Sequence, residues 1–291
     1  MLNSNNFKRL PIWVRRNVPL NEQIKNVRKI LKKYNLNTVC DEARCPNKGV
    51  CFEKNTATFM ILGKKCTRNC KFCSVTCESP EEIDPLEPIK IAQAVLELGL
   101  KYVVITSVTR DDLLDYGSEH FVNTIRTIKN FNPGIKIEVL VPDFLGKESE
   151  IKKVIKAHPD VFCHNIETVP RLYKDVRNGA SYDRSLYVLN YVNKINPNLP
   201  TKSGLMVGLG ENIDEIIKVM EDLYKINCWI LTIGQYLQPT KFNLPVSKYY
   251  TPEEFEYLKE WAYKIGFKKV VSSPLVRSSF MAENIFPNSR H

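Results

Sequence analysis

The stretch KKCTRNCKFCSVTCES, residues 64–79, follows directly on the apolar run TATFMILG, residues 56–63. The run has the composition of a buried strand, and the cysteines begin where that strand would end. Cys66, Cys70 and Cys73 give the spacing C-x3-C-x2-C. In a barrel of parallel strands, the loops that follow the strands carry the chemistry. The stretch therefore predicts a thiol site at the mouth of an α/β fold.

Apolar runs separated by helical patterns continue along the chain. They are rich in Val, Ile and Thr and mostly lack strict alternation, which is typical of parallel strands buried on both faces. Because strands and helices alternate, we expect an α/β fold. A partial (β/α)6 TIM-like barrel is favoured over an open doubly wound sheet, since VGLGEN lacks the third glycine of a dinucleotide site. The six expected strands cover residues 56–63, 101–107, 135–141, 161–167, 201–208 and 229–236.

Helices are indicated by apolar stripes and by end signals. Residues 24–31, 88–99 and 213–224 each place apolar side chains at helical spacing. A further helix begins at TPEEF, where Thr251 can be the N-cap and Glu254 can complete a capping box. We divide the chain into an N-terminal extension (1–55), a barrel (56–266) and a C-terminal extension (267–291).

Bulk composition limits the classes of function. The 291-residue chain has nine cysteines and a net charge of +10. It has no stretch near the roughly 18 apolar residues of a membrane span, and its first twenty residues lack a secretory signal core. We therefore expect a cytoplasmic protein with reduced thiols and no membrane partner, in which cysteines serve metal or redox chemistry. The charge indicates a solvated basic surface first and an acidic protein partner second.

The spacing of Cys66, Cys70 and Cys73 allows three kinds of site. Zinc usually takes two ligand pairs, but only Cys70 and Cys73 form a C-x2-C pair and no histidine is close in sequence. Adding Cys77 gives a four-cysteine run whose first spacing differs from that of ferredoxins. The third possibility is a 4Fe–4S cluster on three thiolates, with one iron open to a small molecule.

A second group of thiols precedes the first strand. Cys40, Cys45 and Cys51 read C-x4-C-x5-C in an irregular segment that contains Pro46 and Gly49. Buried structural cysteines are the alternative, but the neighbouring side chains are polar. We therefore expect this segment to wrap a metal group.

The C-x3-C-x2-C motif after a first barrel strand resembles that of the radical S-adenosylmethionine (SAM) enzymes. Together with the upstream C-x4-C-x5-C motif it resembles one family of that group, the lipoyl synthases. The resemblance extends from Lys8 to Glu283. The blocks that carry it, in order, are ARCPNKGVCFEKNTATFMILG, CTRNCKFCSV, ITSVTRDDLLDYGSEHF, HNIETVPRLYKDVR, TKSGLMVGLGE, QYLQPT and SSPLVRSS.

The resemblance implies two 4Fe–4S clusters and SAM as cofactors. The first cluster would cleave SAM at its open iron, and the second would be consumed as the sulfur source. Sulfur would enter carbons 6 and 8 of an octanoyl group on a lysine of a lipoyl carrier domain or H protein. An electron donor and an iron–sulfur repair protein would be further partners. The implied ligands are Cys66, Cys70 and Cys73 for the first cluster, and Cys40, Cys45, Cys51 and Ser279 for the second.

Five residues are candidate SAM contacts by the same resemblance. Phe72 would lie by the adenine, Ser107 by the methionyl part, and Asn165 with Glu167 by the ribose. Gly208 belongs to a G-x-I-x-G-x-x-E pattern. Two of these have simpler interpretations, because Glu167 could be in a strand-end ion pair and Gly208 in a strand-to-helix turn.

Several other residues have expected roles. Cys77 is expected not to bind the cluster, because a fourth thiolate would exclude SAM. Cys163 and Cys228 are expected to be buried small apolar side chains, and His164 a buried histidine with its hydrogen bonds satisfied. Arg277 could face the second cluster or cap the tail.

Two other functions fit part of the pattern. A radical SAM methylthiotransferase that acts on tRNA also has two clusters, and the basic charge would suit it. Such enzymes normally carry an added RNA-binding domain, for which this chain has no room, so we expect no nucleic-acid partner. A non-enzyme alternative is an iron–sulfur scaffold or a zinc nucleic-acid-binding module.

Overall fold

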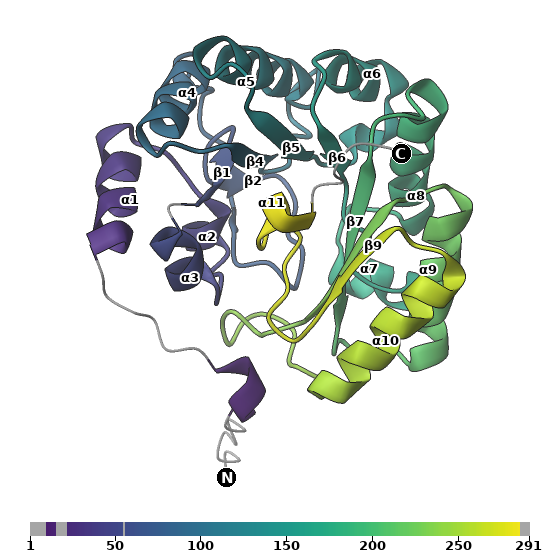
Figure 1. Ribbon diagram of the computed structural model, residues 1–291. Coiled ribbons are helices and arrows are strands. Elements are labelled where there is room, and N and C mark those ends of the chain that lie inside the picture. Colours follow the sequence, from purple (N-terminus) through teal and green to yellow (C-terminus); the bar gives the residue numbers. More distant parts are fainter. Residues whose placement is uncertain (1–9, 16–21, 55, 286–291) are drawn as a thin grey trace.

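A curved parallel sheet forms the centre of the molecule (Figure 1). The computed structural model describes residues 10–15, 22–54 and 56–285. The sheet has seven strands in the order β1-β4-β5-β6-β7-β8-β9, and every neighbouring pair is parallel. The strands are β1 (Thr58–Ile61), β4 (Tyr102–Ser107), β5 (Lys136–Leu140), β6 (Val161–Cys163), β7 (Thr201–Val207), β8 (Ile230–Gln235) and β9 (Lys269–Ser272).

The partial barrel expected from the sequence is confirmed, with one strand more than predicted. All six predicted runs contain a strand of the sheet. The seventh strand, β9, pairs with β8 through Ile230 and Lys269. It lies in residues 267–291, for which the sequence predicts only a C-terminal extension. Its apolar run is only Val270–Val271 between lysines and serines, too short to be recognised as a strand.

Helices cover the outer face of the sheet (Figure 1). Thr251 caps α10 with the predicted capping box, and Gly266 ends that helix in the left-handed conformation. Within the described residues, no helix combines the length and apolar character that crossing a membrane requires. The longer helices are α1 (Glu22–Lys33), α4 (Glu87–Glu97), α5 (Ser118–Phe131), α6 (Glu148–Lys156), α8 (Tyr182–Ile195), α9 (Ile213–Lys225) and α10 (Pro252–Ile265).

Short elements occupy the segments between strands and helices. Strands β2 (Lys65–Cys66) and β3 (Thr76–Cys77) pair with each other in the cysteine-rich stretch. The remaining elements are η1 (Ile12–Val14), η2 (Phe144–Gly146), η3 (Pro170–Leu172), α2 (Val39–Glu42), α3 (Lys48–Glu53), α7 (Tyr173–Val176) and α11 (Ala282–Ile285).

The segment around Cys40–Cys51 is more regular than predicted. The sequence indicated an irregular chain, which is wrong, because α2 and α3 occupy most of it. The Thr38 hydroxyl accepts a hydrogen bond from Asp41 N and so caps α2. Phe52 anchors α3 in the core. Pro46 lies between the two helices, where its missing N–H removes no helical hydrogen bond.

The last described helix, α11, lies inside the curve of the sheet. Helix α11 stands in the middle of the barrel, enclosed by the strands (Figure 1). Its Ala282 packs against Tyr102 and Val104 of β4, and its Ile285 packs with Ile230 of β8. The residues before α11, including Ser279, must therefore cross the barrel interior.

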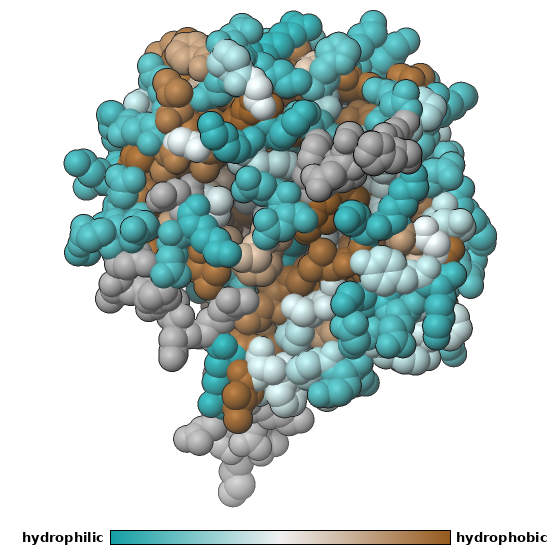
Figure 2. Space-filling model, viewed as in Figure 1, coloured by the Kyte–Doolittle hydropathy of each residue, from teal (hydrophilic) through white to brown (hydrophobic). Residues whose placement is uncertain are grey.

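On the face that Figure 2 shows, mostly polar side chains surround a band of apolar ones.

Candidate active site at the mouth of the barrel

A cavity of about 440 Å³ lies at the carboxyl ends of the barrel strands. Cys66, Cys70 and Cys73 line it together, on the loop that follows β1. The sequence therefore placed these three thiols correctly, since the loop after the first strand opens into the barrel mouth.

Backbone amides point at two of these sulfur atoms. Thr109 N donates to Cys66 Sγ at 3.3 Å and Arg68 N donates to the same atom at 3.4 Å. Val75 N donates to Cys73 Sγ at 3.4 Å. Donors of this kind favour the thiolate and tune the potential of an iron–sulfur cluster.

Burial strongly perturbs the thiols of the loop. Burial, with a smaller contribution from the neighbouring thiols, raises the pKa of Cys70 to about 11 and that of Cys73 to about 12. Three neighbouring thiolates repel one another unless positive charge lies between them. Iron supplies that charge, so the donor set fits a cluster held by these three residues. Cys77 is exposed and is not among the residues that line the cavity.

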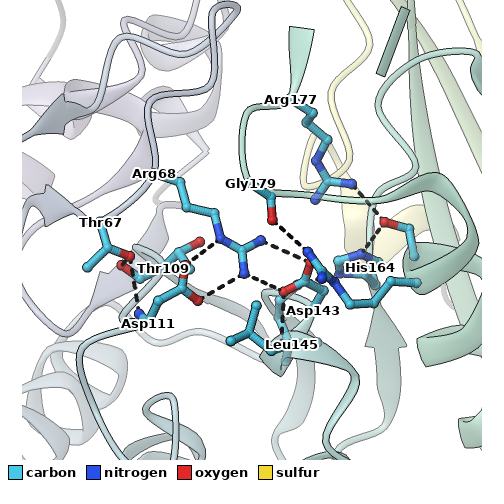
Figure 3. Close-up of polar contacts among 12 residues, drawn as sticks. Thr67, Arg68, Thr109, Asp111, Asp143, Leu145, His164, Arg177 and Gly179 are labelled. Atoms are coloured by element: carbon cyan, nitrogen blue, oxygen red, sulfur yellow. Dashed lines mark hydrogen bonds and ion pairs between the residues drawn. The ribbon is translucent and has the colours of Figure 1, made fainter. Parts of the chain in front are cut away.

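Arg68, between the first two cysteines, fixes the loop to two neighbouring strand ends (Figure 3). Its Nε and Nη2 bind the two carboxylate oxygens of Asp111 at 2.6 and 2.9 Å. Its Nη1 and Nη2 bind Asp143 at 2.9 and 2.7 Å. Burial opposes ionisation of Asp143, but the bonds and charge of Arg68 outweigh it and lower the pKa of that carboxyl. The loop is thus held by a buried, doubly bidentate ion pair.

Four of the five candidate SAM contacts line the same cavity, namely Phe72, Ser107, Asn165 and Glu167. The Ser107 hydroxyl is buried and has no hydrogen-bond partner among the described residues. A buried hydroxyl without a partner is costly, so this atom fits a polar group of a bound ligand.

Glu167 stands at the cavity wall with an unusual backbone. Its φ is +66°, and its carboxylate accepts a hydrogen bond from Asn165 Nδ2 at 3.0 Å. Burial raises its pKa. Within the described segments Glu167 forms no ion pair at contact distance, but the charges of Arg177 and Arg277 act on its carboxylate. A strained residue at a cavity is a candidate binding group.

Gly208 is not brought to the cavity. Its φ is +105°, and a side chain there would overlap Gln235 and the Lys248 carbonyl. Glu211 accepts a hydrogen bond from Leu209 N at 2.9 Å and so closes the turn after β7. The strand-to-helix turn, our alternative interpretation, therefore accounts for the glycine.

The upstream cysteines and the C-terminal tail meet at the other side of the cavity. Cys45 and Ser279 both line it. Cys40 is buried nearby, and burial, together with Cys45 and Cys51, raises its pKa to about 12. Asn47 Nδ2 donates to the Leu275 carbonyl at 2.5 Å. The expectation that the tail folds back to the 40–51 segment is thus confirmed.

Arg277 lies between the two halves of the cavity. Burial lowers its pKa, while the nearby Cys45 and Glu167 raise it. The guanidinium also donates to the Val276 carbonyl at 2.6 Å. The charge of Arg277 is therefore close enough to Cys45 to interact with it, and its guanidinium binds the carbonyl of the preceding tail residue. Its pairing with the second cluster and its capping of the tail both stay predictions.

Within the part of the chain that the structure describes, no three His, Cys, Asp or Glu side chains are grouped as ligands of a single metal ion. A cluster distributes its ligands over several irons, so its thiols stand further apart than the ligands of one ion. No disulfide links any two of the nine cysteines, all of which lie in the described part of the chain.

Comparison with known proteins agrees with this arrangement. A family model of the radical SAM superfamily matches residues 60–223, and one of the N-terminal domain of lipoyl synthase matches residues 1–45. Lipoyl synthase of Caldicellulosiruptor saccharolyticus is 55% identical over 94% of this chain and 96% of its own length. Lipoyl synthase of Buchnera aphidicola is 51% identical over 97% and 90%. The chain belongs to the lipoyl synthase family.

The chain is therefore an enzyme that makes lipoyl groups by radical SAM sulfur insertion. Its superfamily implies a 4Fe–4S cluster and SAM. Solved structures agree in fold at 15% identity. The match to Streptococcus suis SuiB bound to S-adenosylmethionine has a TM-score of 0.59. It covers 78% of this chain and 55% of SuiB. Methylornithine synthase has a TM-score of 0.58, with coverage of 88% and 84%.

Sequence reasoning missed two sets of residues in this lipoyl synthase. Arg68 was noted only as a positive charge, whereas it binds Asp111 and Asp143. The signal was present, because both aspartates closely follow predicted strands, at whose ends polar side chains converge. Arg177 was also missed. Its Nη1 donates to the Asn165 carbonyl at 2.9 Å and to Ser185 Oγ at 3.0 Å.

Three residues that the sequence placed outside the site are buried as predicted. Cys163 and Cys228 are buried. His164 is buried as well, with Nδ1 2.8 Å from the Val141 carbonyl and Nε2 3.1 Å from Ser185 Oγ. Burial lowers its pKa to about 4, so the ring is neutral near pH 7 and serves the packing around Arg177.

Proposed function

We propose that this lipoyl synthase acts on an octanoyl group amide-linked to a lysine of a lipoyl carrier domain or H protein, and inserts sulfur at carbons 6 and 8. One observation carries the proposal. Cys66, Cys70 and Cys73 line the same cavity as Cys45 and Ser279. Two thiol sites that share one cavity suit a reaction in which one activates carbon and the other donates sulfur.

In this proposal, Cys66, Cys70 and Cys73 hold a 4Fe–4S cluster whose fourth iron binds SAM. When bound, the cluster and SAM supply a radical that removes a hydrogen atom from an unactivated carbon. The protein binds and orients SAM. The free hydroxyl of Ser107 contacts its polar methionyl part, and Asn165 with Glu167 contacts the ribose.

The second cluster is held by Cys40, Cys45, Cys51 and Ser279. A serine oxygen is a hard ligand on soft iron and is therefore the weakest of the four. Loss of the iron that it binds would expose sulfide toward the cavity, where the substrate carbon lies. The tail supplies this ligand because its path crosses the barrel interior beside the 40–51 segment.

The walls of the cavity suit a fatty chain. Apolar side chains such as Val108, Leu140 and Leu205 line it together with the thiols. Burying methylene groups there is favourable, at about 0.8 kcal/mol each, and it removes water from the reacting carbons. The cavity wall thus positions the fatty chain by apolar contacts, and the proposed reaction needs no side-chain base.

Partners follow from the surface charge. The net charge of +10 favours a carrier domain with an acidic face, because opposite charges accelerate association. An electron donor and a protein that rebuilds the second cluster complete the cycle. We propose no nucleic-acid or membrane partner, and a cytoplasmic setting in which the thiols remain reduced.

A single-turnover reaction tests the proposal. The holoenzyme, with its clusters rebuilt from ³⁴S sulfide, is mixed with an octanoyl-lysine peptide, SAM and a reductant, and the peptide is analysed by mass spectrometry. We expect a product that has gained two ³⁴S atoms. Unchanged peptide beside cleaved SAM, or product without the label, would contradict the substrate or the sulfur source.

A further inference from the structure

Two glycines in neighbouring strands are not explained by backbone conformation. Nine of the twelve glycines have a positive φ, but Gly204 in β7 and Gly234 in β8 do not. A side chain at Gly204 would overlap Ser278 Oγ and Asn165 Oδ1, and one at Gly234 would overlap the Val276 carbonyl of the tail. These strands therefore leave a groove, the two-glycine groove, that admits the tail only because both residues lack a Cβ.

The tail in this groove is hydrogen-bonded to the proposed SAM site. Ser278 Oγ donates to Asn165 Oδ1 at 2.7 Å. The same amide donates through Nδ2 to Glu167 Oε1 at 3.0 Å. Since Asn165 uses its oxygen toward the tail and its nitrogen toward Glu167, the two bonds together fix which way the amide faces. All three residues line the cavity.

Ser278 is adjacent in sequence to Ser279, the proposed ligand of the second cluster. Any shift of the tail that moves Ser279 therefore also moves the hydroxyl that holds Asn165. Cys66, Cys70 and Cys73 come from a different loop. The contact of Ser278 with Asn165 therefore links the tail to the proposed SAM site independently of those cysteines.

We propose that Ser278 is a positioning residue that orients Asn165 and Glu167 for SAM while the two-glycine groove seats Ser279 at the second cluster. The inference rests on the proposed function, which places SAM against Asn165 and Glu167. Because coupling between sites is reciprocal, a seated tail favours SAM binding and bound SAM favours a seated tail. The ligand of the sulfur-donating cluster and the SAM that activates carbon would thus be in place at the same time.

A double-mutant cycle tests the role of Ser278. The SAM dissociation constants of the anaerobic holoenzyme and of Ser278→Ala, Asn165→Ala and the double variant are measured by calorimetry, with iron and sulfide content determined for each. Ser278→Ala should weaken SAM binding about fivefold, the value of one hydrogen bond, at unchanged iron content. The double variant should bind no more weakly than Asn165→Ala, because Ser278 acts through Asn165.

Two controls separate this role from general damage. Ser278→Thr keeps the hydroxyl and should restore SAM affinity. Ser149 is exposed in α6, outside the cavity, and its hydroxyl binds only Glu150, so Ser149→Ala should bind SAM as the unmodified enzyme does. Additive effects of Ser278→Ala and Asn165→Ala would overturn the role of Ser278 alone. Unchanged SAM affinity in Asn165→Ala would instead overturn the proposed SAM site, and this inference with it.

The groove has its own test. Gly234→Ala would bring its Cβ into overlap with the Val276 carbonyl oxygen, which is tail backbone and cannot rotate away. It should therefore displace the tail and lose iron from the second cluster, while the cluster on Cys66, Cys70 and Cys73 keeps its electron paramagnetic resonance signal after reduction. A folded Gly234→Ala protein with both clusters intact would overturn the groove. If Gly234→Ala does not fold, the Ser278 cycle still decides the inference.

Discussion

The two thiol sites of this lipoyl synthase are built in opposite ways. The cluster loop (residues 64–79) carries its three cysteines within eight positions, and one arginine in the loop ties it to neighbouring strand ends. The second site joins the 40–51 segment to the tail, across 228 residues between Asn47 and Leu275. The first site is therefore local and can be recognised from the sequence, whereas the second depends on the path of the whole chain.

Removing a thiol of the local site should give the largest effect. Cys70→Ala removes one of three iron ligands, so the cluster is lost and both SAM cleavage and sulfur insertion should fall to background. The assay is chromatography of 5′-deoxyadenosine. Cys77→Ala is the matched control, because Cys77 is exposed and outside the cavity. If Cys77→Ala also abolished SAM cleavage, the assignment of the first site would be wrong.

Removing the ligand from the tail should separate the two activities. Ser279→Ala should still cleave SAM, since the loop cluster is untouched, yet it should form no sulfur-containing peptide. Mass spectrometry of the peptide and chromatography of 5′-deoxyadenosine in one reaction give both readings. Full sulfur insertion by Ser279→Ala would mean that the tail contributes no cluster ligand.

The buried anchor of the loop should dominate stability. Arg68→Met leaves Asp111 without its partner and leaves the fully buried Asp143 with Arg184 alone. Breaking a buried pair lowers the free energy of unfolding by about 3–5 kcal/mol, and the remaining Arg184 places the expected loss at the lower end of that range. Arg171→Met removes an ion pair with Glu215 from an arginine that is 56% exposed, and should change stability by less than about 1 kcal/mol. Anaerobic chemical denaturation compares the two. Equal effects would show that the Arg68 network does not hold the loop.

The contact between the 40–51 segment and the tail should give the smallest effect. Asn47→Ala leaves the Leu275 carbonyl without its donor, which costs about 1–3 kcal/mol when the group is buried. We expect a matching fall in unfolding free energy and faster removal of iron from the second cluster by a chelator. Unchanged iron release would contradict a role for this bond in seating the tail.

The contrast between the sites also explains what could be predicted. Cys66, Cys70 and Cys73 were found because their spacing and the preceding strand are local features. The strands before the tail were found for the same reason, while β9 was too short. Ser279 came only from family resemblance, because a tail serine has no local signal, and the fit of Ser278 against Gly204 requires two segments that only the folded chain brings together.

The most direct test is an iron-anomalous electron-density map of the anaerobic holoenzyme with SAM. The account predicts two clusters facing one cavity: one on Cys66, Cys70 and Cys73 with SAM on its fourth iron, and one on Cys40, Cys45, Cys51 and Ser279. A fourth side chain on the first cluster, or Ser279 Oγ bound to no iron, would contradict it.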